Sequence, residues 1–154
     1  DRVNDNLRNF VHGTFLIMGI LFVFQSIGLS LAGMKAPLVF GLFCAITNVI
    51  PYLGPYIGGV PTVLIGFSID PLVGIFSLVS VVVCQTLESY FLQPVVMGKT
   101  MKLHPVTIMI GLLIFGHFFG IIGMILATPT IAIFKTIAMF FDEKYNIVGR
   151  IQDE

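Results

Sequence analysis

The chain contains very little charge. Asp, Glu, Lys and Arg make up 10% of its 154 residues and hydrophobic residues make up 56%, whereas a soluble domain has about 25% charged residues. Two long stretches, Ala36–Ile69 and Leu103–Phe134, contain no Asp, Glu, Lys or Arg at all. A chain this short has too little interior to bury so much apolar surface. The composition therefore argues against a soluble enzyme and predicts an integral membrane protein.

Features that other functional classes require are also missing. The net charge is zero, and Lys and Arg form no basic cluster, which argues against nucleic acid binding. The sequence has no Gly-rich loop ending in Gly-Lys-Ser/Thr, no His/Cys cluster and no Ser-centred nucleophile elbow, so we expect no catalytic residue, no metal and no cofactor. The two cysteines, Cys44 and Cys84, stand singly in apolar stretches and are interpreted as small buried side chains.

Four apolar blocks are long enough for membrane helices, which need about 20 residues to cross the hydrocarbon core. Phe10–Met34 and Pro71–Met97 are predicted to be single long helices. Pro37–Ile69 and Pro105–Phe141 are interrupted by prolines and glycines, so each is predicted to fold as a helical hairpin. The expected fold is an all-α integral membrane protein and a single transmembrane domain, with two long helices that are each followed by a Pro/Gly-broken helical hairpin.

The two halves of this pattern share one spacing. Pro37 and Pro61 are 24 residues apart, and so are Pro105 and Pro129. The spacing predicts repeat units at 8–69 and 71–141, and three segments in each unit would make the second run inverted in the membrane, as in many transporters. The alternative is coincidence, because the chain has eight prolines and no other residues align.

Basic residues near short loops and helix ends favour the cytoplasmic side of a membrane. If Arg2 and Arg8 lie inside, the four blocks place seven of the eight Lys and Arg residues inside and leave Lys35 outside. We therefore expect a multi-pass protein with both ends of the chain in the cytoplasm.

Glu88 is the sole formal charge between Asp70 and Lys99. An acidic residue within a membrane segment is by default a functional-site hypothesis, and Gln85 lies one turn earlier on the same helical face. We predict that Glu88 binds and releases a proton or exchanges it for a cation. The alternative is a place near the membrane surface, where Glu88 would reach water or pair with Lys99.

The first hairpin carries polar and helix-breaking residues at its centre. Carbonyl groups exposed by such a break would suit a small polar ligand or an ion. The alternative for Asn48 is that it caps a helix end. The candidates for the transport path in this segment are Asn48, Pro51, Tyr52, Gly54 and Pro55.

Several other residues have a packing interpretation. Small residues four apart let membrane helices approach closely, and Gln25 and Ser26 are interpreted as helix–helix hydrogen-bonding residues. His117, at the predicted turn of the second hairpin, either joins a proton relay or meets water. The glycines assigned to packing are Gly58, Gly116, Gly120 and Gly123, and Gly54 shares the spacing with Gly58.

Five short motifs occur in a recognisable order. They are Ile50-Pro51-Tyr52-Leu53-Gly54-Pro55, Gln85-x-x-Glu88, Pro94-x-x-Met97-Gly98-Lys99, Leu103-His104-Pro105 and Phe119-Gly120-x-x-Gly123. Together they resemble the autoinducer-2 exporter family, the PerM-type permeases of bacteria. The resemblance extends from about Asn6 to Phe141.

The resemblance implies a secondary transporter of the bacterial inner membrane. Some members of the family are assigned to export of the autoinducer-2 signal and others to sodium or lithium/proton antiport. Members are longer than this chain, which looks like their C-terminal half. The motifs add His104 and Pro105 to the transport-path candidates.

The expected partners are the lipid bilayer, a small solute or a monovalent cation with protons, and further copies in a homo-oligomer. Three functions stay open at this stage. The first is export of a small solute coupled through Glu88, and the second is sodium(lithium)/proton antiport. The third is a non-transporting membrane assembly module, in which the glycine faces drive association.

Overall fold

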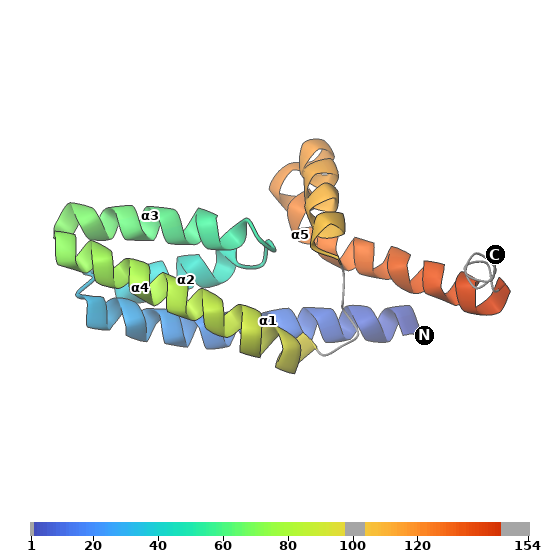
Figure 1. Ribbon diagram of the computed structural model, residues 1–154, viewed down its shortest axis with the longest axis horizontal. Helices are drawn as coiled ribbons and strands as arrows, with labels where there is room; N and C mark the ends of the chain where they lie inside the picture. Colours follow the sequence, from blue (N-terminus) through green and yellow to red (C-terminus); the bar gives the residue numbers. More distant parts are fainter. Residues whose placement is uncertain (1, 98–103, 146–154) are drawn as a thin grey trace, which may run out of the picture. The chain divides into compact units, whose positions relative to one another are not determined.

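A computed structural model of the protein describes residues 2–97 and 104–145. These residues form helices and no strands, as predicted. The helices are α1 (Arg2–Ala32), α2 (Pro37–Thr47), α3 (Gly54–Ile69), α4 (Pro71–Leu87), the π-helix η1 (Glu88–Met97) and α5 (Pro105–Tyr145) (Figure 1). Three apolar spans in them are long enough to cross a membrane: Leu7–Ala32, Pro71–Val96 and Pro105–Ala138. The all-α membrane fold is confirmed.

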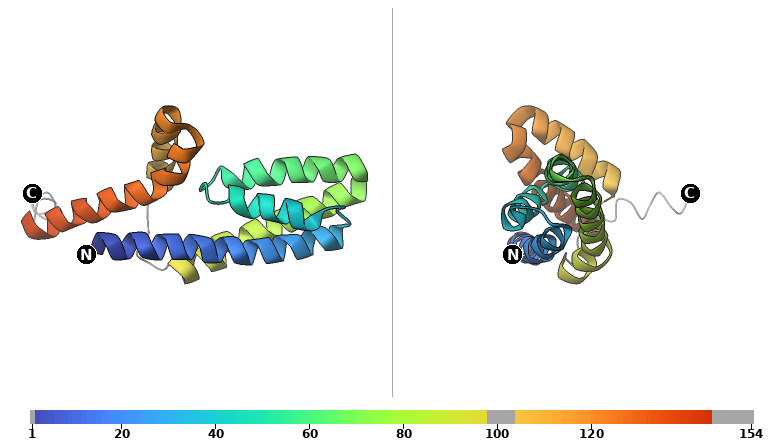
Figure 2. Two further views of the ribbon diagram at one scale, coloured as in Figure 1. Left: turned by 180° about the vertical axis from the view of Figure 1, so that it is seen from behind. Right: turned by 90° about the vertical axis from the view of Figure 1, so that its left-hand side faces the viewer.

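The chain divides into two compact units, one of residues 11–97 and one that includes α5. In the first, α2 and α3 form the predicted hairpin, and α4 packs closely along α3 (Figures 1 and 2). The hairpin turn lies between Thr47 and Gly54, where Tyr52 takes a left-handed backbone with φ of 62°. Pro55 stands in the first turn of α3, where its missing N–H removes no helical bond.

Small residues set how closely the helices of this unit approach. A Cβ atom added to Gly58 in α3 would lie 2.9 Å from Cα of Cys44 in α2, so the two backbones touch at this point. Two turns further along α3, Gly66 lies beside Ser77 of α4, which is fully buried. Gly58 therefore lies at a close approach of two helices, as small residues between membrane helices allow, and its assignment to packing stays a prediction.

The start of α4 is fixed by Asp70. Its Oδ1 accepts a hydrogen bond of 2.8 Å from the backbone N–H of Leu72, and Pro71 takes the first helical position. A side chain in this role stabilises a helix by about 1 kcal/mol. We expect Asp70→Ala to lower the free energy of unfolding by about that amount, and Asp70→Ser to retain most of it. Thermal unfolding of the two variants in detergent tests this, and equal stabilities would show that the cap contributes nothing.

The predicted helix at Pro71–Met97 forms, with one difference in its last part. The backbone changes from α-helix to π-helix at Glu88 and keeps that form to Met97. The π-helix contains Pro94, which has no N–H to donate to the preceding turn. π-helices are rare and are frequently found at functional sites, so the start of η1 at Glu88 makes this residue a candidate for function.

The second predicted hairpin is present as a break within α5. Gly120 leaves helical geometry with φ of 63° and ψ of −143°, a conformation that glycine adopts without steric cost. The chain folds back there, as the close approach of residues on the two sides of the break shows. A Cβ on Gly116 would lie 2.7 Å from Cε of Met124, and a Cβ on Gly123 would lie 2.7 Å from Cβ of Phe119. Exposed His117 stands before this turn, with its ring edge-on to Phe118 at 5.3 Å. The relation of the two hairpins by an inverted repeat stays a prediction.

Candidate functional site

Glu88 lies at the junction of α4 and η1 and is 4% exposed. Its Oε2 accepts a hydrogen bond from Nδ2 of Asn48, and its Oε1 accepts one of 3.3 Å from Nε2 of Gln93. The carboxyl group is therefore buried in the protein, where the amides of Asn48 and Gln93 both donate to it. This burial disagrees with the alternative of a water-exposed surface position, and Lys99, its other proposed partner, lies outside the described residues.

Asn48 has two roles at the end of α2. Its backbone N–H donates to the carbonyl of Cys44 at 3.2 Å and so closes the last helical turn, while its side chain reaches across to Glu88. The capping interpretation and the site interpretation therefore apply to different atoms of one residue. The following turn fixes this geometry, since a Cβ on Gly54 would lie 2.6 Å from Cα of Asn48.

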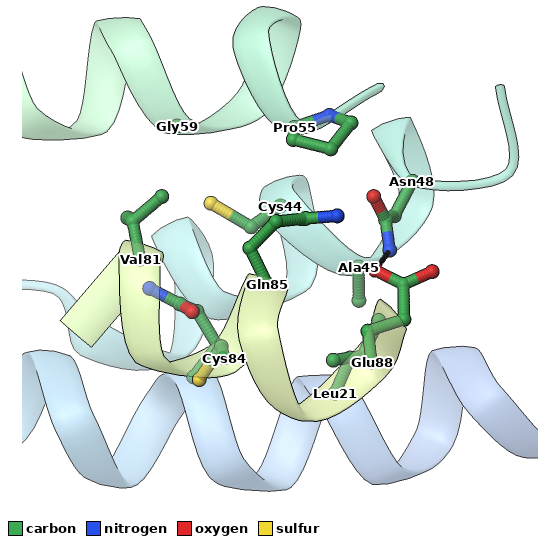
Figure 3. A pocket seen from close by; sticks show the side chains of 11 residues that line it. Leu21, Cys44, Ala45, Asn48, Pro55, Gly59, Val81, Cys84, Gln85 and Glu88 are labelled. Atoms are coloured by element: carbon green, nitrogen blue, oxygen red, sulfur yellow. Dashed lines mark hydrogen bonds between the residues drawn. The ribbon is translucent and has the colours of Figure 1, made fainter. Parts of the chain in front are cut away.

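A cavity of about 30 Å³ adjoins Glu88 and is lined by residues from α1 to α4 and by Glu88 itself (Figure 3). A buried water needs about 10–15 Å³, so there is room for about two groups of that size. Figure 3 shows Gln85, Asn48 and Glu88 gathered on one side of it. The lining residues are Leu21, Gln25, Cys44, Ala45, Asn48, Pro55, Gly59, Val81, Cys84, Gln85 and Glu88.

The polar lining offers one carboxyl group, three side-chain amides and two thiols, and no Lys, Arg or His among the described residues. Carboxyl and amide oxygens are the ligands that hard cations prefer. No three His, Cys, Asp or Glu side chains gather into a metal-binding group in the parts of the chain that the structure describes. Chemically, the arrangement is suited to a proton or a small monovalent cation.

The structure brings some of the predicted site residues together and places others elsewhere. Glu88, Gln85, Asn48 and Pro55 line one cavity. The remaining candidates of the first hairpin shape the turn that carries Asn48: Pro51, Tyr52 and Gly54. The last two candidates belong to the other unit, at the start of α5, where Nδ1 of His104 accepts a hydrogen bond of 3.4 Å from the residue after Pro105.

The interpretation of Gln25 is confirmed, because its Nε2 donates to Oγ of Ser80 on α4 at 3.5 Å. Ser26 is buried without a hydrogen-bond partner in the described part of the chain, so its predicted hydrogen bond is not found. The sequence interpretation missed Gln93, since a residue five positions after Glu88 is on a different face of an α-helix. The π-helix brings Gln93 and Glu88 together, and the sequence analysis did not predict a π-helix.

Comparisons of the sequence with known proteins identify its family. The sequence model described as AI-2E family transporter matches residues 1–142. The chain belongs to the AI-2E transporter family. It is 40% identical over 139 residues to a Bacillus subtilis (strain 168) protein named "Putative transport protein YrrI", an alignment that covers 90% of this chain and 39% of that protein. The predicted family resemblance is confirmed.

Two further relatives match a similar part of this chain. YueF of the same Bacillus subtilis strain is 40% identical over 133 residues, covering 86% of this chain and 36% of its own length. A Thermotoga maritima protein is 28% identical over 129 residues, covering 83% of this chain and 40% of its own length. The chain thus spans well under half the length of these relatives, which are also named as transport proteins. No solved structure matches it.

Proposed function

We propose that this chain supplies the ion-coupling site of a secondary transporter, in which Glu88 alternately holds a proton and a monovalent cation. The observation that carries the proposal is the Glu88 carboxyl group, buried between apolar membrane helices and held by Asn48 from the turn of the α2–α3 hairpin. The AI-2E family membership supports a permease role.

The charge of the buried Glu88 carboxyl group favours a bound ion. An isolated carboxylate is costly to bury, and its cost falls when it is paired or neutralised. The amides of Asn48 and Gln93 provide hydrogen bonds but no positive charge. A bound proton or cation supplies the missing positive charge, so binding of either ion to Glu88 is favourable. One ion can therefore replace the other at this site.

The volume of the cavity beside Glu88 favours a small ion. A cavity of about 30 Å³ is roughly a tenth of the smallest pockets, about 300 Å³, that enclose organic ligands. It accommodates a dehydrated or singly hydrated sodium or lithium ion beside the oxygens of Glu88, Asn48 and Gln85. This favours sodium(lithium)/proton antiport as the reaction at this site. Export of an autoinducer-2-type signal would need a wider path formed by other parts of the protein, with Glu88 as the coupling residue.

The packing around Glu88 also provides a way for an ion to reach it. Asn48 belongs to the α2–α3 hairpin and Glu88 to the α4–η1 helix, so the hydrogen bond between them joins two separate elements. Movement of the hairpin relative to α4 would part the two side chains and open the cavity, as alternating access requires. The expected setting is the bacterial inner membrane, with both chain ends in the cytoplasm and the protein in a homo-oligomer.

Proton flux across proteoliposomes tests the function. With the intact protein reconstituted and a pH gradient imposed, we expect added sodium or lithium to drive proton movement and potassium to drive far less. Solute-dependent proton movement without a sodium or lithium response would favour the exporter. Correctly assembled protein that moves neither would favour the non-transporting assembly module and contradict the proposal.

A further inference from the structure

The hydrogen bond from Gln93 to Glu88 depends on the form of the helix that joins them. In an α-helix each residue turns the chain by about 100°, so side chains five positions apart point to different sides. In a π-helix the repeating hydrogen bond runs from residue i to i+5, which brings these two positions into line. The 3.3 Å contact between Nε2 of Gln93 and Oε1 of Glu88 thus exists because η1 begins at Glu88.

The two ends of this hydrogen bond have different surroundings. Glu88 is buried, whereas the side chain of Gln93 is exposed on the surface of its unit. Two other residues of η1, Leu92 and Val96, pack against the apolar cluster around Leu21 and Ala45. Packing therefore holds η1 through Leu92 and Val96, whereas the Gln93 amide is exposed and is held by its hydrogen bond to Glu88.

The two carboxyl oxygens of Glu88 also face different partners. Oε2 accepts from Asn48, which lines the cavity, and Oε1 accepts from Gln93, which is exposed and is not among the lining residues. An amide that is exposed among apolar side chains gains from pairing with the carboxylate, since an unpaired polar group is costly in hydrocarbon. The hydrogen bond between Gln93 and Glu88 is consequently favoured over an unpaired amide.

We propose that Gln93 is a positioning residue that stabilises the charged form of Glu88 through the π-helix and uncovers its Oε1 when it turns away. This inference rests on the proposed coupling role of Glu88 and adds the residue that controls its ion affinity. A hydrogen bond to an ionised group is among the stronger ones. Loss of the Gln93 donor should therefore make Glu88 bind a proton about tenfold more tightly.

Among the residues that the structure describes, few other groups near Glu88 can change charge. Cys44 of α2 and Cys84 of α4 line the cavity, and α1 and α3 contribute no titratable residue to its lining. On η1 itself, Tyr90 is 75% exposed. A change in the titration of Glu88 caused by a substitution at Gln93 can thus be assigned to the lost donor.

Infrared difference spectroscopy of the intact protein in lipid bilayers tests the proposal. The C=O band of protonated Glu88 is identified as the one that is missing from Glu88→Gln, and its intensity is followed against pH. We expect Gln93→Met, which keeps the side-chain length and removes the donor, to move the midpoint by about one pH unit toward higher pH. Tyr90→Phe, which removes an exposed hydroxyl from the same helix, is the matched control and should titrate like the unmodified protein.

A midpoint in Gln93→Met equal to that of the unmodified protein would overturn the proposal. If this variant does not reconstitute, Gln93→Asn keeps the amide but shortens the side chain and should shift the midpoint in the same direction. The readout does not depend on transport. A shift in a protein without cation-driven flux would therefore contradict the proposed function and leave the role of Gln93 supported.

Discussion

Replacement of Glu88 by Gln is expected to reduce cation-driven proton flux to the level of protein-free liposomes. The amide keeps the size of the side chain and can still bond to Asn48, but it neither titrates nor carries the negative charge that a cation needs. Glu88 is the one carboxyl group in the lining of the cavity, so no neighbouring described group can replace it there.

Proteoliposomes with an imposed pH gradient and sodium added outside give the measurement. Thr86→Val is the matched control, because Thr86 lies two residues away on α4, is exposed and bonds only to the carbonyl of Val82 among the contacts observed. It should transport normally. Normal flux in a correctly folded Glu88→Gln protein would show that the coupling group lies elsewhere.

The second large effect is structural. Gly58→Ala should destabilise the protein by about 2 kcal/mol, within the range measured for overpacked cores. The new Cβ would lie 2.9 Å from Cα of Cys44, and backbone of a neighbouring helix cannot rotate away as a side chain can. The α2–α3 hairpin would have to separate at that point, close to the turn that presents Asn48.

Gly19→Ala is the matched control for this substitution. Gly19 is exposed on α1 and a Cβ there would meet nothing within 4 Å, so the variant should be as stable as the unmodified protein or more so, since alanine favours helix. Thermal unfolding in detergent compares the two. Equal stability of both variants would show that α2 and α3 are not in close contact in the folded protein.

The helices were predictable because their signals are local. Apolar blocks of membrane-spanning length predict the long helices, and the Pro/Gly segments predict both hairpins. The turn of the second hairpin was predicted at His117 and lies at Gly120, because several glycines in this segment can take a positive φ and the sequence does not distinguish them.

The candidate site was predicted in part. Glu88 was recognisable as a charge in an apolar block, and Asn48 as a polar residue at a helix break. Their contact spans 40 residues of sequence and depends on how the hairpin packs against α4, which no local pattern encodes. Gln93 was missed for a different reason, since its position relative to Glu88 follows from a π-helix that propensities do not predict.

Competition between sodium and protons at Glu88 tests the central claim most directly. The C=O band of protonated Glu88 would be titrated at increasing sodium concentration in the intact protein in bilayers. If both ions use the carboxyl group, sodium will displace the proton and move the midpoint toward lower pH as its concentration rises, and an equal concentration of potassium will do so less. A midpoint that is independent of sodium would contradict a shared site at Glu88.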